Sequence, residues 1–149
     1  MADRRHHGPA EKRRLMLLVD TNVLVDVFED DPDWVQWSVA KLREQSSLRT
    51  LAINPIIYSE LAFSFSTIEK LDAVIAGLRL VYKEIPRPAL FLAGKAFVQY
   101  KRRGGAKTNV LSDFFIGAHA AILGCPLLTR DPSRYRTYFP TVDLITPES

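Results

Sequence analysis

The stretch Leu15-Met16-Leu17-Leu18-Val19 is uniformly apolar and ends abruptly at the polar triplet Asp20-Thr21-Asn22. A short apolar run without alternation is typical of a β-strand that is covered on both faces, as in a parallel sheet. The chain becomes apolar again over residues 23–28, in a form that fits a first helix. A buried strand followed by a polar turn and a helix predicts the opening unit of an α/β fold.

The rest of the chain continues this alternation of short apolar segments and helical segments, without internal repeats. We therefore expect one α/β domain over residues 15–149, with a parallel sheet of about five short strands and helices on both faces. The expected strands cover residues 15–19, 50–53, 80–85, 126–129 and 142–145.

Capping residues predict where several helices begin. Asp33 is the expected cap of a helix to about residue 45, and Asn54 is the expected cap of a helix that starts at Pro55. Ser66 with Glu69 forms a capping box for a helix to about residue 77. In the second half of the chain, Pro88 and Ser112 open helices that end before Gly104 and Gly124 respectively.

The charges are unevenly distributed along the chain. Residues 1–14 carry five cations and two acids and therefore account for the whole net charge of +3. This segment has no apolar period and is predicted to be a disordered basic tail. Residues 20–33 carry six acids and no cation, whereas residues 83–107 carry seven cations and one acid. Separate acidic and basic surfaces suit a protein that holds a metal cation and a polyanion together.

The composition restricts the class of protein. With 149 residues, 47% of them hydrophobic, the chain can bury the core of one globular domain. The single Cys125 permits no internal disulfide, so we expect a reducing, cytoplasmic location and interpret Cys125 as a small buried hydrophobe. His119 is interpreted as a packed core histidine. No apolar run of about 18 residues is present, so no membrane span is expected.

Four carboxylates occupy places that suggest a common site. Asp20 directly follows the first strand, Asp131 follows the fourth, and Glu60 and Asp113 lie on helices that can face the same edge. Ligands of open parallel sheets bind beyond the carboxyl ends of the strands. Taken singly, each acid also fits an ordinary role as a cap, dipole partner or turn residue. Gathered carboxylates repel one another unless a cation binds, and oxygen ligands suit Mg²⁺ or Mn²⁺.

Basic side chains near these acids could hold the backbone of a nucleic acid. A metal bound by carboxylates can activate water and stabilise a phosphodiester transition state. Aromatic residues interleave with basic ones over residues 134–139, where stacking on unpaired bases and packing in the core remain alternative roles. The candidate phosphate-binding residues are Lys101, Arg102, Arg103, Lys107, Arg130 and Arg134.

Four separate segments together resemble the PIN-domain nucleases. They read LLVDTNVLVD, PIIYSEL, LSDFFIGAHA and LLTRD, at residues 17–26, 55–61, 111–120 and 127–131. The match covers about residues 15–146 in the family's order and spacing. The size of the chain and its ending are most similar to the VapC-type toxins of type II toxin–antitoxin pairs. The basic extension before the first strand departs from the family's usual start.

This resemblance implies a Mg²⁺- or Mn²⁺-dependent endoribonuclease that leaves 5′-phosphate and 3′-hydroxyl ends. Asp20, Glu60 and Asp113 would be the core catalytic and metal-binding acids, with Asp131 as a more variable fourth. Supporting roles fall to Asn22 and Thr129 near the metal and to Ser112 as the cap that holds Asp113.

The resemblance also implies partners. These are an RNA substrate, a VapB-type antitoxin that holds the toxin inactive, a second copy of the chain in a homodimer, and operator DNA contacted through the antitoxin. Helices at 33–45 and 67–77 are candidate surfaces for such contacts. The alternative function is a catalytically silent PIN-fold domain that binds RNA or a protein partner.

Overall fold

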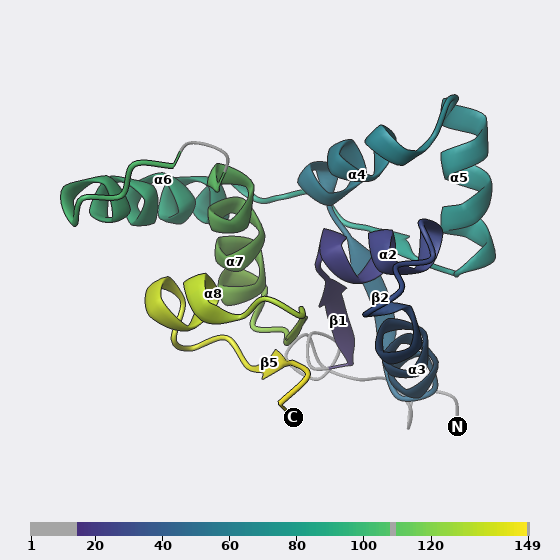
Figure 1. The fold of residues 1–149 in the computed structure, drawn as a ribbon. Helices are drawn as coiled ribbons and strands as arrows, with labels where there is room; N and C mark the ends of the chain where they lie inside the picture. The colour runs from purple at the N-terminus through teal and green to yellow at the C-terminus, as the bar shows by residue number, and fades with distance from the viewer. Residues whose placement is uncertain (1–14, 108–109, 149) are drawn as a thin grey trace, which may run out of the picture.

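The computed structural model describes residues 15–107 and 110–148, and its centre is a five-stranded parallel sheet (Figure 1). The predicted tail at 1–14 lies outside the described residues. The strand order is β3-β2-β1-β4-β5, and all four pairings are parallel. The strands are β1 (Met16–Val19), β2 (Thr50–Ile53), β3 (Val81–Tyr82), β4 (Leu127–Leu128) and β5 (Leu144–Ile145).

Seven α-helices in the described part of the chain connect and cover the strands. From β1 the chain moves outward to β2 and β3, then crosses back to β4 and β5. Right-handed connections therefore place α2, α3 and α5 on one side of the sheet and α6, α7 and α8 on the other, as Figure 1 shows. The helices are α2 (Thr21–Phe28), α3 (Val35–Ser46), α4 (Pro55–Leu61), α5 (Ile68–Gly77), α6 (Arg87–Arg102), α7 (Leu111–Leu123) and α8 (Ser133–Tyr138), with a 3₁₀ turn η2 (Ala62–Ser64) after α4.

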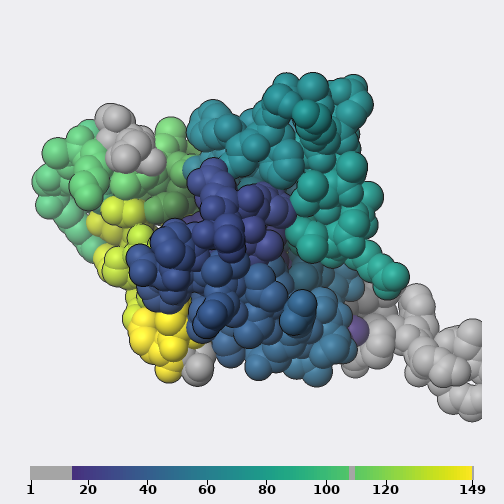
Figure 2. Space-filling view, turned by 45° about the vertical axis from the view of Figure 1, so that its right-hand side comes forward, coloured from purple at the N-terminus to yellow at the C-terminus, as the bar shows by residue number. Residues whose placement is uncertain are grey.

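This arrangement confirms the predicted α/β class, the parallel five-stranded sheet and helices on both faces. Figure 2 shows the teal α5 segment and the green α6 segment at opposite sides of the molecule. Among the described residues, no helix has the length and apolar character needed to cross a membrane.

The core lies where the central strand meets the flanking helices. Leu17, Leu18 and Val19 of β1 are completely buried, because β1 is hydrogen-bonded on both edges and covered on both faces. Burying one such side chain stabilises the fold by about 1.5–3 kcal/mol. On α7, His119 is also completely buried, and Cys125 just beyond that helix is 3% exposed, which confirms both interpretations.

Two of the predicted helix caps are wrong. The side chain of Asp31, not that of Asp33, accepts hydrogen bonds from the backbone N–H groups of Asp33 and Trp34, at 2.9 and 3.0 Å. The helix α3 begins only after this turn. Thr67, not Ser66, caps α5, because its hydroxyl accepts from the backbone N–H of Lys70. In each case a neighbouring side chain with the same capping chemistry is placed better by the preceding turn.

The predicted cap at Ser112 is also wrong. α7 begins at Leu111, so Ser112 already lies inside the first turn, and the N-cap position belongs to Val110, which makes no side-chain cap hydrogen bond. The end of α7 is as predicted, since Gly124 adopts the left-handed conformation with φ of 68°. α8 was not predicted at all.

Candidate active site

Asp20 lies at the carboxyl end of β1 and is only 4% exposed. Its backbone N–H donates to the carbonyl oxygen of Leu128 at 2.9 Å, so the β1–β4 pairing fixes its position. The carboxylate oxygen Oδ1 accepts from the backbone N–H of Thr21 at 2.8 Å. Oδ2 accepts from the hydroxyls of Thr129 at 2.8 Å and Tyr135 at 2.9 Å. All of these donors are neutral groups.

The electrostatics of Asp20 are those of a carboxylate without a cation. Burial and, second, the charge of Asp113 raise its pKa to about 7, against the hydrogen bonds from Thr129 and Tyr135, which lower it. Among the described residues, the lysine and arginine ion pairs all involve other acids. A buried carboxylate with only neutral donors strongly favours a proton or a bound cation.

Glu60 reaches the same edge from α4. That helix starts where Asn54 caps it, with the Asn54 side chain accepting from the backbone N–H of Ile57 at 2.9 Å. The Thr21 hydroxyl donates to Oε1 of Glu60 at 2.6 Å. Because Thr21 directly follows Asp20, this bond brings the Glu60 side chain close to the end of β1.

Asp113 approaches from the first turn of α7. Its Oδ1 lies 3.5 Å from the Tyr135 hydroxyl, and its Oδ2 accepts from Nη1 of Arg134 at 2.7 Å. Burial raises the pKa of Asp113, whereas the hydrogen bond and charge of Arg134 lower it; the charges of Glu60 and Asp131 raise it further. Tyr135 therefore stands between Asp20 and Asp113.

Asp131 lies at the exposed rim of this group. Its backbone N–H donates to the Thr129 hydroxyl at 3.1 Å, which ties the loop after β4 to the buried acid Asp20. Asn22 adds weaker support, since its amide nitrogen is 3.4 Å from both Oδ2 of Asp20 and the hydroxyl of Thr129. Asp20, Glu60 and Asp113 thus surround the hydroxyls of Thr21 and Tyr135, with Asp131 outside them.

Two residues of this site were not predicted from the sequence, Thr21 and the hydroxyl of Tyr135. Tyr135 is 1% exposed, so its ring belongs to the core while its hydroxyl bonds to the acids. Burial and the nearby carboxylates raise its pKa well above the ordinary value, so it remains a protonated donor. A tyrosine near the start of a short helix has no local sequence pattern that predicts this role.

The basic candidates fall into two groups. Arg130 and Arg134 each bind a carboxylate of the chain itself, on Asp26 and Asp113 respectively. The others are exposed at the end of α6 and just beyond it. This exposed basic group consists of Lys101, Arg102, Arg103 and Lys107.

Comparison with known proteins identifies the family. The sequence matches the PIN domain over residues 17–140. The chain belongs to the PIN-domain family. A comparison with curated protein sequences finds no match.

Solved structures share the fold of this PIN domain at low sequence identity. VapBC-1 from nontypeable Haemophilus influenzae has a TM-score of 0.68 and 20% identity, with 90% of this chain and 99% of that chain covered. VapBC2 from Rickettsia felis, bound to a DNA fragment from its promoter, has a TM-score of 0.66 and 20% identity, with coverage of 88% and 98%. A toxin–antitoxin complex from Klebsiella pneumoniae has a TM-score of 0.63 and 21% identity, with coverage of 88% and 97%.

The donor chemistry of the PIN domain fits a hard divalent metal. Asp20, Glu60 and Asp113 supply only oxygen atoms, the ligands that Mg²⁺ and Mn²⁺ prefer, and Asp20 is buried with neutral partners. In the part of the chain that the structure describes, however, no three acidic, histidine or cysteine side chains converge closely enough to hold a metal. Metal binding by these acids therefore requires side-chain movement. Of the three, only Asp113 is paired with a cation, Arg134.

An ion pair behind the site anchors the loop that carries Thr129 and Asp131. Arg130 donates through Nε and Nη2 to the two carboxylate oxygens of Asp26 at 2.8 and 3.0 Å, and Ser38 also donates to Asp26. Asp26 is 1% exposed, so its charge depends on these partners.

Replacing Asp26 with Ala is expected to lower the free energy of unfolding by about 2–4 kcal/mol, because it leaves the Arg130 cation without its partner. Urea denaturation of the purified chain measures this difference. The exposed Asp33→Ala variant is the matched control and is expected to change stability by less than about 0.5 kcal/mol. An equal effect of the two substitutions would contradict the anchoring role of the ion pair.

His119 links α7 to the start of α4. The side-chain amide of Asn54 lies 3.0 Å from Nδ1 of His119, and because Oδ1 of Asn54 already accepts from Ile57, this amide donates to an unprotonated Nδ1. Burial, assisted by the charge of Lys83, lowers the pKa of His119 to about 4. His119 must therefore be neutral in the folded protein.

His119 is expected to make stability depend on pH on the acid side. The unfolded chain binds a proton at His119 near pH 6.5 and the folded protein only near pH 4, so stability falls as the pH drops between these values. We expect a loss of about 2–3 kcal/mol at pH 4.5 relative to pH 7 that His119→Asn lacks. Urea denaturation of both proteins at the two pH values tests this, and equal slopes would contradict it.

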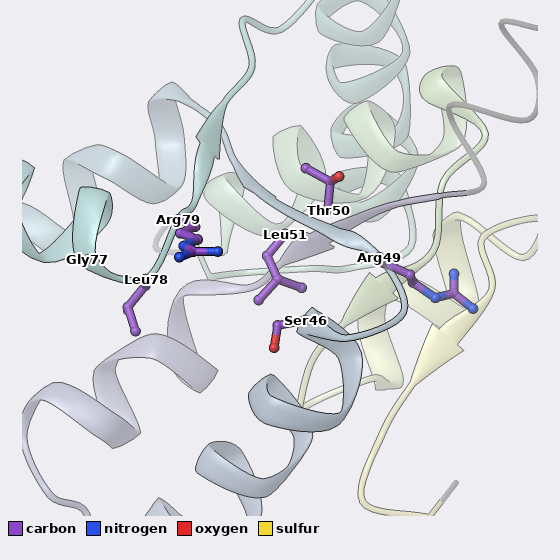
Figure 3. A pocket seen from close by; sticks show the side chains of 7 residues that line it. All are labelled: Ser46, Arg49, Thr50, Leu51, Gly77, Leu78 and Arg79. Atoms are coloured by element: carbon purple, nitrogen blue, oxygen red, sulfur yellow. The ribbon is translucent and has the colours of Figure 1, made fainter. Parts of the chain in front are cut away.

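A hollow in the surface lies at the opposite end of the strands from the acids. Figure 3 shows it, with Arg49 and Arg79 on opposite sides of Leu51. Thr50, the first residue of β2, contributes to its wall and pairs with Met16 at the start of β1. The length of β1, roughly 13 Å, therefore separates this hollow of about 500 Å³ from Asp20. Its lining residues are Ser46, Arg49, Thr50, Leu51, Gly77, Leu78 and Arg79.

Proposed function

We propose that this PIN domain is a Mg²⁺- or Mn²⁺-dependent endoribonuclease and the toxin of a type II toxin–antitoxin pair. The observation that carries the proposal is the meeting of Asp20, Glu60 and Asp113 from three different elements at the carboxyl edge of the sheet, with Asp20 buried among neutral donors. The fold shared with toxin–antitoxin complexes supports it.

The three acids would hold the metal, with Asp131 beside them at the rim. A divalent ion held there would lower the pKa of water and offset the charge that develops on a phosphodiester in the transition state. The hydroxyls of Thr129 and Tyr135 orient Oδ2 of Asp20.

Thr21 performs the same task for Glu60 through its 2.6 Å hydrogen bond. Asn22 supports Asp20 and Thr129, and Ser112 lies beside Asp113 in the first turn of α7. The hydroxyls of Thr21, Thr129 and Tyr135 thus hold Asp20 and Glu60 without neutralising them, which keeps their negative charge available to a cation.

The exposed basic group at the end of α6 is suited to hold the RNA backbone. Two of its residues contact aromatic side chains near Arg134: Arg103 stacks on Tyr138 of α8 at 5.5 Å, and the backbone N–H of Lys107 donates to the hydroxyl of Tyr100, the ring over which Arg134 lies. Binding by such cations depends strongly on salt and little on sequence. Unpaired segments are the expected targets, because their bases and phosphates are accessible.

The remaining partners follow from the same proposal. The complexes that share the fold, one of them bound to promoter DNA, support an antitoxin as the partner. The proposal extends to operator DNA contacted through the antitoxin and to a cytoplasmic location. A homodimer through α3 and α5 is also proposed, and the exposed apolar side chain of Ile68 at the start of α5, which is 60% exposed, supports it. Light scattering tests it, and a monomeric mass with and without antitoxin would contradict it.

Cleavage of total cellular RNA by antitoxin-free protein tests the proposed activity. We expect discrete fragments with Mg²⁺ or Mn²⁺, none with a chelator, and a loss of rate of about 100-fold or more for Glu60→Gln. Glu148→Gln is the matched control, because Glu148 is exposed and bonds to Arg136. Intact RNA in every reaction with folded protein would favour the catalytically silent binding domain.

A further inference from the structure

Arg134 stands between the acids and the exposed basic group. Its Nη1 donates to Oδ2 of Asp113 at 2.7 Å, and its guanidinium carbon lies 5.8 Å from the ring centroid of Tyr100. The Arg134 side chain is 24% exposed and that of Asp113 is 31% exposed, so the ion pair is accessible to solvent. Arg134 also lines a shallow hollow of about 250 Å³ with Tyr100, Ser133, Thr137 and Tyr138.

The ion pair occupies one of the two carboxylate oxygens through which Asp113 could bind a metal. Asp20 and Glu60 are held by neutral hydroxyls, but Oδ2 of Asp113 is held by a cation. A guanidinium and a divalent ion cannot both lie against one carboxylate oxygen without strong repulsion. Metal binding through Oδ2 of Asp113 therefore requires Arg134 to leave, and a metal on Oδ1, which lies 3.5 Å from the Tyr135 hydroxyl, would still be repelled by the guanidinium beside it.

Once released, Arg134 could bind an anion supplied by the substrate. Its side chain is long and partly exposed, and the hollow that it lines opens beside Tyr138, on which Arg103 of the exposed basic group stacks. A guanidinium binds a phosphate group through two parallel hydrogen bonds, as it binds a carboxylate. An RNA backbone that passes from the basic group to the acids runs past this position.

We propose that Arg134 is an internal counter-ion that competes with the divalent metal for Asp113 and, when the metal displaces it, binds a phosphate of the RNA. This inference rests on the proposed function and adds a regulating residue to it. Arg134 thereby sets the metal concentration at which the site assembles and links metal binding to substrate binding.

Calorimetric titration with Mn²⁺, on full-length protein treated with a chelator and dialysed, tests the competition. Removal of the competing cation in Arg134→Gln is expected to tighten Mn²⁺ binding about 3- to 10-fold. Arg136→Gln, two residues along α8, is the control, because Arg136 pairs with the exposed Glu148 and is expected to leave Mn²⁺ binding unchanged. A merely structural role of Arg134 predicts the opposite sign, a weakened metal site.

The kinetics of RNA cleavage at saturating Mn²⁺ test the second half of the inference. Arg134→Gln is expected to raise KM for RNA about 3- to 10-fold, because a phosphate contact is lost. Mn²⁺ binding that is unchanged or weaker in Arg134→Gln would overturn the competition, and an unchanged KM would overturn the phosphate contact. Absence of Mn²⁺ binding by the wild-type protein would instead overturn the proposed metal site itself.

Discussion

Replacing Asp20 with Asn is expected to abolish RNA cleavage and, in the presence of a chelator, to raise the free energy of unfolding. The first effect follows because Asp20, 4% exposed, is the most buried of the four acids of the site and contributes a central ligand to the proposed metal site. We expect the cleavage rate to fall by about 1,000-fold or more, as when a main electrostatic contact of an active site is removed. Rates of fragment formation and urea denaturation measure the two effects.

The gain in stability follows from the pKa of Asp20, which burial and the charge of Asp113 raise from 3.8 to about 7. The ionised side chain is therefore less favourable in the folded protein than in the unfolded chain. This destabilisation is absent below pH 3.8, grows as the pH rises and is complete above pH 7. About three pH units correspond to roughly 4 kcal/mol. The Asn variant is thus expected to be more stable by a few kcal/mol at pH 8 and by little at pH 4.

Added metal is expected to offset this difference. Saturating Mn²⁺ stabilises only the protein that binds it, by about 4.1 kcal/mol at 1,000 times Kd. Asp143→Asn is the matched control, since Asp143 is exposed, and its stability is expected to follow the wild type at both pH values. An Asp20→Asn variant that is less stable than wild type at pH 8 with chelator would contradict the electrostatic description of this site.

Replacing Gly117 with Ala is expected to destabilise the protein by about 2–3 kcal/mol. Gly117 lies on α7 where α8 crosses it, and a Cβ there would lie 2.6 Å from Cε2 of Phe139, closer still to its Cδ2, and 3.0 Å from Cδ1 of Tyr135. Both aromatic rings are buried, so they cannot yield without disturbing the core. Movement of Tyr135 also displaces its hydroxyl from Asp20, and cleavage is expected to slow.

Gly94→Ala is the control for this prediction. Gly94 lies inside α6, and a Cβ there meets nothing within 4 Å. Alanine is the better helix former, so this variant is expected to gain about 0.5–1 kcal/mol. Urea denaturation of both variants measures the difference, and a stable, fully active Gly117→Ala protein would show that α8 is not held against α7 as described.

The strands β1 and β2 and the start of α4 could be predicted to within one residue because local chemistry decides them. Uniform apolar runs mark strands that are buried on both faces, and Asn54 with Pro55 can only open a helix where they stand. α8 could not be predicted, because six residues are too few to show a helical period. Its conformation depends instead on how Tyr135 and Phe139 pack against Gly117, which lies far away in the sequence.

The same distinction applies to the candidate site. Asp20 could be placed at the sheet edge because it ends a buried strand, and the carboxyl ends of parallel strands meet there. The hydrogen-bond partners of the acids could not be predicted from the sequence, since the Thr21–Glu60 and Tyr135–Asp20 bonds join residues 39 and 115 positions apart. The ion pairs of Arg130 and Arg134 are likewise long-range contacts, and in the sequence both residues look like free cations.

Cleavage of RNA in water enriched in oxygen-18 tests the central claim most directly, because it reports which oxygen attacks the phosphodiester. The antitoxin-free protein is incubated with cellular RNA and Mn²⁺, and the ends of the fragments are analysed by mass spectrometry. We expect 5′-phosphate ends that carry one oxygen-18 atom and 3′-hydroxyl ends, all absent with a chelator and with Asp20→Asn. Fragments that end in 2′,3′-cyclic phosphates, or that form equally well with the chelator, would contradict metal-dependent hydrolysis at this site.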